Sequence, residues 1–160
     1  MKERYMKYYL LGFADAEGCF SISLKRQDTA RFGWALDPVF QITQHNSNKN
    51  ILELFQKVLK CGRIIQKPGQ PDLSLFLVDN RRQLVEKIIP FFEKYKLLAK
   101  NKDFEKFRKV INGLENKMHH NKETFIELIK ECYEMNLGKQ RRYKLEEVLE
   151  DIEKRDPQRL

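Results

Sequence analysis

The amino-acid sequence predicts an α+β fold in which helices cover one face of a four-stranded antiparallel sheet. The apolar spacing switches between helical and alternating periods in the order α-β-β-α-β-β-α, and helical spacing then continues. The predicted strands form two pairs, each joined by a short polar or glycine- and proline-containing loop. We expect a single domain over residues 1–160, with a helical C-terminal extension over about residues 115–160.

The first half of the chain gives a helix followed by two alternating strands. Apolar residues three and four apart predict a helix over 4–17, and Gly18 occupies the position where a left-handed cap usually falls. Apolar and polar residues then alternate over 20–25, and a second alternating stretch runs over 34–44. Pro38 within it indicates a sheet edge or a bulge, because proline cannot donate to a strand ladder.

A second helix and a second pair of strands follow. The buried-face spacing predicts a helix over 48–60, with Asn46 or Ser47 as its N-terminal cap. Two short alternating stretches over 63–67 and 73–78 are separated by a loop that contains two prolines and a glycine.

The remaining chain reads as helical. We expect a helix over 81–95 and further helices over 102–114, 122–136 and 143–154, with Gly113 as one of the breaks between them. With the helices on one face of the sheet, the other face would be polar and open.

Charge is the first indication of function. The formal net charge is +8 and the sequence pI is about 9.4, which favours a polyanionic partner such as nucleic acid or an anionic membrane surface. No apolar run is long enough to span a membrane, and the acids Asp15 and Glu17 interrupt the only stretch that resembles a signal peptide. Three dispersed cysteines favour an intracellular compartment without disulfides, and no glycine-rich phosphate loop or catalytic triad indicates a small-molecule cofactor.

The segment 10–18 has two unusual physical features. Gly12 and Ala16 lie four residues apart on one helix face, where small side chains allow another helix to approach closely. Asp15 and Glu17 lie in the last turn, where the helix dipole disfavours each anion by roughly 0.3–1 kcal/mol. A divalent cation would compensate these charges, whereas the alternative is a frayed surface helix with two solvated acids.

These residues resemble a known family signature. The run Leu-Leu-Gly-Phe-Ala-Asp-Ala-Glu-Gly is similar to the signature of the LAGLIDADG homing endonucleases, single-motif homodimeric type, and it is identical at Leu10, Gly12, Asp15, Ala16 and Gly18. Further segments resemble the family in order: 40–44, 88–92, 97–100, 103–104, 135–136 and 141–144. The resemblance implies an αββαββα homing-endonuclease fold, whose saddle-shaped sheet lies in the DNA major groove, and metal-dependent cleavage of both strands.

The resemblance also implies roles for individual residues. Glu17 matches the metal-binding carboxylate, and Gly18 would offer its backbone carbonyl to the same ion. Gln44 matches the residue that orients the attacking water, with a plain surface glutamine as the alternative. Lys100 matches the cation that stabilises charge on the phosphate, and Lys102 is an alternative because lysines crowd this segment. The expected ion is Mg²⁺; Mn²⁺ would substitute for it, and Ca²⁺ would bind without supporting cleavage.

Asp15, the other acid of the signature, is expected to be structural. A further family position that is often basic falls near Asn48 or Lys49, with Asn48 as the aligned residue. The open face of the sheet would read double-stranded DNA through its outward side chains. The expected readers are Ser21, Ser23, Lys25, Gln27, Ala35, Asp37, Gln41, Arg63, Ile65 and Lys67, with Leu75 and Leu77 as further candidates. Arg141 and Arg142 are expected to grip phosphates.

One signature helix per chain implies assembly. Cutting a duplex twice with one Glu17 per chain requires a homodimer, with Leu10, Gly12, Phe13 and Ala16 at the interface and a long pseudo-palindromic target. The expected function is intron or mobile-element homing by hydrolysis of DNA phosphodiesters, in a bacterial or archaeal cytoplasm, a chloroplast or a mitochondrion. The alternatives are an inactive DNA-binding regulator, an RNA maturase on the same fold, and an unrelated basic interaction protein.

Overall fold

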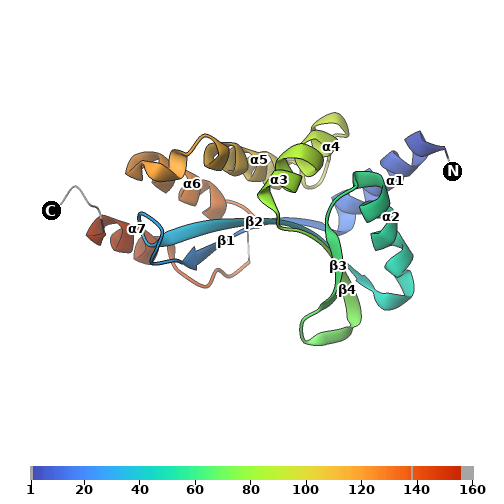
Figure 1. Cartoon of the computed structure of the whole chain (residues 1–160), viewed down its shortest axis with the longest axis horizontal. Coiled ribbons are helices and arrows are strands. Elements are labelled where there is room, and N and C mark those ends of the chain that lie inside the picture. Colours follow the sequence, from blue (N-terminus) through green and yellow to red (C-terminus); the bar gives the residue numbers. More distant parts are fainter. Residues whose placement is uncertain (1, 138, 156–160) are drawn as a thin grey trace. The chain divides into compact units, whose positions relative to one another are not determined.

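The computed structural model describes residues 2–137 and 139–155, and its elements follow the predicted order (Figure 1). The sheet has the strand order β1-β2-β4-β3, and β4 runs antiparallel to both β2 and β3. The helices and strands that form the predicted core order are α1 Glu3–Glu17, β1 Gly18–Arg26, β2 Trp34–His45, α2 Lys49–Leu59, β3 Arg63–Lys67 and β4 Gln70–Val78. The later helices are α3 Arg81–Gln83, α4 Ile89–Lys94, α5 Asn101–Glu115, α6 Lys122–Tyr133 and α7 Leu145–Lys154.

The chain forms two compact units. The first consists of Met1–Phe20 and Val39–Phe104, and the second of Ser21–Pro38 and Glu105–Leu160. Strands β1 and β2 therefore contribute residues to each unit. Within the described residues, no helix is long and apolar enough to cross a membrane, and Cys61 and Cys132 are buried free thiols.

Aromatic side chains fill the core of the first unit. Phe20 stacks on Phe40 with the ring centroids 4.9 Å apart, and Phe92 and Phe104 pack against Phe20 at 5.3 and 5.4 Å. Phe55 of α2 stacks on Phe76 of β4 at 5.8 Å. All of these rings are at most 1% exposed. The helices of this unit therefore cover the sheet face that carries Phe40 and Phe76, as predicted.

Gly18 joins α1 to β1, but not through the left-handed cap that the sequence suggested. Its backbone is extended, with φ −68° and ψ 150°. A Cβ at this position would lie 2.5 Å from the carbonyl oxygen of Ala14. The expectation of a left-handed glycine is therefore wrong, because the close approach of the helix carbonyl, and not a positive φ, excludes a side chain here.

The start of α2 also differs from the prediction. Asn46–Asn48 form a short 3₁₀ turn, and the ring of His45 accepts a hydrogen bond from the Ser47 amide at 3.2 Å. The Asn46 side chain instead donates to Pro71 O at 2.9 Å and accepts from Ser74 Oγ at 2.7 Å. Asn46 thus ties the turn to β4, and so it is not available to cap the helix.

The predicted helix over 81–95 contains a π-helical turn. Leu84–Ile88 separate α3 from α4, and Pro90 is the second residue after this turn. Proline has no N–H and its ring crowds the preceding turn, so a wider turn before it relieves the clash.

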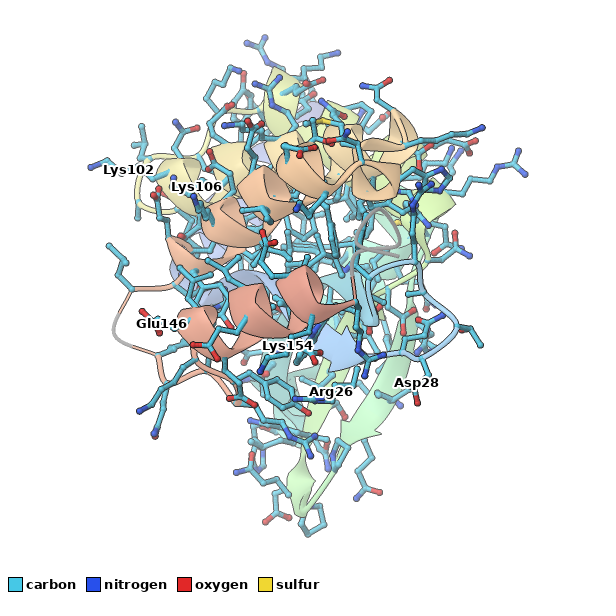
Figure 2. All side chains as sticks on the ribbon, turned by 90° about the vertical axis from the view of Figure 1, so that its left-hand side faces the viewer. Arg26, Asp28, Lys102, Lys106, Glu146 and Lys154 are labelled. Atoms are coloured by element: carbon cyan, nitrogen blue, oxygen red, sulfur yellow. The ribbon has the colours of Figure 1, made fainter. Side chains whose placement is uncertain are left out.

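The second unit packs α5, α6 and α7 around the distal parts of β1 and β2. Gly113 lies inside α5, so the prediction that it breaks the helix is wrong. A Cβ there would meet Leu128 of α6 at 2.5 Å, so the close packing of the two helices accounts for the glycine. Trp34 Nε1 donates to Asp151 of α7 at 2.8 Å. Arg26 lies 4.9 Å over the Trp34 ring and 3.4 Å from Glu147 of α7, and Figure 2 shows its side chain beside that helix.

Candidate nucleic-acid interface

The end of α1 is fixed to the segment before α5 by one carboxylate. Asp15 Oδ2 accepts hydrogen bonds from the amides of Leu98 and Ala99 at 3.1 and 3.0 Å, and Oδ1 accepts one from Lys100 N at 3.0 Å. Burial opposes ionisation of Asp15, but the three backbone bonds outweigh it and lower the pKa of this carboxyl. This geometry gives Asp15 the structural position that the sequence led us to expect.

The same arrangement brings Lys100 to the end of the signature helix. Lys100 Nζ donates to the carbonyl oxygen of Ala16 at 3.0 Å. This carbonyl belongs to the last turn of α1, where the helix dipole favours a cation. Glu17 is the next residue and is exposed to solvent. Lys102 is exposed on α5 and extends outward from it (Figure 2), so the ammonium held beside the helix end is that of Lys100.

Gln44 lies near the end of β2, which neighbours the start of β1. The two strands are joined by a hairpin that Gln27 N closes on Gly33 O at 2.9 Å, so the end of β2 lies next to Gly18. Gln44 is half-buried and pairs across the sheet with Ser74. Its side chain therefore lies on the helix-covered face of the sheet, at the end of β2 that is nearest to the end of α1.

The described residues hold no cluster of three or more His, Cys, Asp or Glu side chains that could bind a metal ion. Glu17 is thus one carboxylate at an exposed helix end and not part of a preformed cage. Any ion there would take its remaining ligands from outside this chain or from backbone carbonyls such as that of Gly18.

The outward face of the sheet in the first unit follows from the strand register. Gln41 and Arg63 both lie opposite Leu77 on β4, while Thr43 and Ile65 both lie opposite Leu75. Residues paired across antiparallel strands share a face, so the predicted readers Gln41, Arg63 and Ile65 lie on the face opposite Phe40 and Phe76. The register shifts between Gln66 and Lys67, so the pairing does not assign Lys67 to this face. Sequence reasoning missed three residues of this face: Thr43, His45 and Leu73.

Two predicted readers are held by acids in this structure. Both terminal nitrogens of Arg63 donate to Asp79, each at 2.6 Å. In the second unit, Lys25 forms an ion pair with Asp37, and both side chains are partly exposed. These acids hold the cations in fixed positions on the strands.

The remaining predicted readers of the second unit lie on β1 and just after it. Ser21 and Ser23 alternate with buried Ile22 and Leu24, which places the serines on the outward side. Gln27 follows the strand, and its amide donates to Thr29 Oγ1 at 3.2 Å. A groove of about 260 Å³ runs beside the serines and is lined on its other side by the 139–143 segment.

Arg141 does not have the position expected of a phosphate ligand. Its guanidinium donates to Ile22 O at 2.9 Å and to Cys132 O, and it lies 4.9 Å over the Tyr133 ring. The prediction for Arg141 is therefore wrong, because these donors are used to join β1 to the end of α6. Arg142 is exposed, 5.4 Å over the Tyr143 ring, and remains a candidate.

The exposed face of α1 differs in part from the predicted interface. A Cβ on Gly12 would meet nothing within 4 Å, and Ala16 is exposed. Leu10 is 0% exposed, so the prediction that it lies at a dimer interface is wrong: it packs in the core of its own chain. Phe13 is half-buried against Phe55. The exposed face also carries three tyrosines that sequence reasoning did not assign to an interface, Tyr5, Tyr8 and Tyr9.

Comparison with known proteins identifies the family. The model of the LAGLIDADG endonucleases matches residues 10–111, well over half of the chain. The chain belongs to this family. Among curated relatives of this LAGLIDADG protein, homing endonuclease I-ApeII of Aeropyrum pernix is 32% identical over 157 residues, which cover 95% of this chain and 93% of the relative. DNA endonuclease I-CeuI of Chlamydomonas moewusii is 35% identical over 77% of this chain, which spans 58% of that relative.

Solved structures of family members share the fold. The archaeal intron-encoded homing endonuclease I-Vdi141I, solved in complex with DNA, superposes with a TM-score of 0.91 at 40% identity, covering 97% of this chain and 99% of that one. The group I intron-encoded homing endonuclease I-CeuI, also in complex with DNA, gives a TM-score of 0.84 at 30% identity, covering 92% of this chain and 76% of that one. The predicted α+β homing-endonuclease fold is confirmed.

Proposed function

We propose that this LAGLIDADG-family chain is a site-specific DNA endonuclease, which acts as a homodimer and makes a Mg²⁺-dependent double-strand break in a long pseudo-palindromic target. The observation that carries the proposal is the end of α1, where exposed Glu17 follows the carbonyl that Lys100 Nζ contacts at 3.0 Å. The DNA-bound relatives support the choice of substrate.

The surface of α1 supports the homodimer. Tyr5, Tyr9, Gly12 and Ala16 follow the three- and four-residue spacing of one helix face, and the two tyrosines are 62% and 44% exposed. The open space at Gly12 leaves room for a second backbone to approach. A two-fold axis along this face would bring two copies of Glu17 to the same place on the duplex.

The donors at this helix end fit magnesium, which prefers oxygen ligands and retains waters. Glu17 would contribute its carboxylate, Gly18 its backbone carbonyl, and the second copy and the scissile phosphates would complete the set. The chemistry that magnesium supplies when bound is stabilisation of the phosphate charge and activation of a water. Mn²⁺ would replace it, whereas Ca²⁺ would support binding without cleavage.

Three side chains of the chain itself would supply the other functions: charge stabilisation, positioning and orientation of water. Lys100 holds a positive charge beside the helix end, in reach of the negative charge that develops on the phosphate. Asp15 accepts hydrogen bonds from the backbone amides of Ala99 and Lys100 and so helps to determine where that ammonium lies. Gln44, at the neighbouring strand end, would orient the attacking water through its amide.

The proposal is tested by selection of cleaved sites from a randomised duplex library with Mg²⁺ present and with EDTA as the control. The expected result is one family of related sites with two-fold symmetric halves, cut on both strands only with the metal. Specific binding without cleavage under any divalent ion would indicate a DNA-binding regulator instead, and the absence of sequence preference would contradict the proposal.

A further inference from the structure

The outward face of β4 is unusually apolar for a sheet face that no helix covers. Leu73, Leu75 and Leu77 occupy three successive outward positions, flanked by Thr43 on β2 and Ile65 on β3. We call these five side chains the aliphatic band. An antiparallel sheet with one open face normally alternates apolar and polar residues, yet β4 also carries Phe76 and Val78 on its core side. The band therefore indicates an apolar contact with a partner.

The side chains of the aliphatic band differ in solvent exposure. Leu75 is 7% exposed and forms its floor between Thr43 and Ile65. Its neighbours Ile65, Leu73 and Leu77 are only half-buried, so they offer side-chain surface above this floor. These three residues are placed to make the contact.

The surroundings of the band identify the partner as nucleic acid and not protein. The exposed Arg63, which Asp79 holds in place, lies on the same face opposite Leu77, and Gln41 lies on the other side of Leu77. The chain as a whole carries a net charge of +8. In the major groove, the one apolar group that base edges present is the 5-methyl group of thymine.

We propose that the aliphatic band reads thymine methyl groups in each half of the target, a refinement that rests on the proposed DNA-cutting function. Alternate residues of a strand lie about 6.6–6.8 Å apart, so the three leucines span roughly 13 Å, or about four base pairs at 3.4 Å each. Each half-site therefore contains at least two thymines, on either strand, within a stretch of about four base pairs.

The test uses the selected site and removes one methyl group of the DNA at a time. Each thymine in turn is replaced by deoxyuridine, which removes only the methyl group, and binding is measured with Ca²⁺. At two or more clustered positions in each half-site, we expect an affinity loss of about threefold to fivefold, since one methyl contributes roughly 0.8 kcal/mol. Ile65→Ser or Leu77→Ser removes this discrimination at its own position.

A matched control keeps the result specific. Val58 is a half-buried aliphatic residue on α2, which covers the opposite face of the sheet. Val58→Ser is expected to retain the full thymine preference, and thermal unfolding of all three variants checks that they fold.

Two outcomes overturn the inference separately. Selected sites that lack clustered thymines, or that tolerate deoxyuridine at every position, contradict the role of the band while the proposed nuclease function stands. Failure to select any preferred site contradicts the proposed function, and the role of the band with it.

Discussion

The end of α1 and the 139–144 segment both carry charged residues that the sequence assigned to DNA, but the two regions use them differently. At the end of α1, backbone amides donate to the half-buried acid Asp15, whereas the neighbouring acid Glu17 is exposed. In the second region, Arg141 donates hydrogen bonds to backbone carbonyls of its own unit. The comparison teaches that a charged residue in a binding-site pattern can instead stabilise the backbone of its own chain, as Asp15 and Arg141 do here.

The largest change in stability is expected at Gly18, directly after the end of α1. Gly18→Ala places a methyl group 2.5 Å from the Ala14 carbonyl, which is shorter than any normal contact. We expect a loss of about 3 kcal/mol of unfolding free energy. Urea unfolding measures it, and Gly12→Ala is the control, because nothing lies within 4 Å of its Cβ in the chain. Equal stability of the two variants would contradict the close approach at Gly18.

Gly12 also separates folding from assembly. Gly12→Leu is expected to leave the folded protomer stable, since leucine favours helix and the space is open within the chain. The same change should convert the dimer to a monomer, as measured by sedimentation with and without target DNA. A dimer that persists in this variant would show that α1 does not form the interface.

The second region is tested by a pair of adjacent arginines. Arg141→Ala removes the hydrogen bonds to Ile22 O and Cys132 O and leaves both carbonyls without this partner. We expect a loss of about 2 kcal/mol of unfolding free energy. Arg142→Ala should leave stability unchanged and reduce the salt dependence of DNA binding by about one unit per phosphate contact. The reverse pattern would restore Arg141 as the phosphate ligand.

The role of Asp15 at the end of α1 can be tested through the pH dependence of the unfolding free energy. Since its folded pKa is lowered, the stability it contributes is present above the unfolded pKa of about 4 and is lost as the pH falls through the folded value. Asp15→Asn should cost about 1–2 kcal/mol at neutral pH and flatten the acid limb of a stability–pH profile. An unchanged profile in the variant would contradict the role of the three amide bonds.

The sequence predicted those parts of the fold and site that depend on local spacing. Period and turn chemistry located the strands and most helices, and the signature placed Glu17 at a helix end. The sequence did not reveal which face of α1 is buried, because the face of Leu10 and the face of Gly12 each combine apolar and charged residues. It also misassigned Arg141, since the carbonyls that hold it come from distant residues. The extra length of β4 before Leu73, over 70–72, depended on pairing that no local pattern encodes.

The central claim is that the exposed carboxylate at the end of α1 is essential for cleavage and not for binding. The most direct test measures the rate at which the Glu17→Gln variant cuts the selected target in the presence of Mg²⁺. The matched control is Glu53→Gln, on the exposed side of α2. The account predicts that Glu17→Gln binds the site with wild-type affinity but loses at least about 100-fold in cleavage rate, on the scale of a lost catalytic group, whereas Glu53→Gln cuts normally. Cleavage by Glu17→Gln at near the wild-type rate would contradict it.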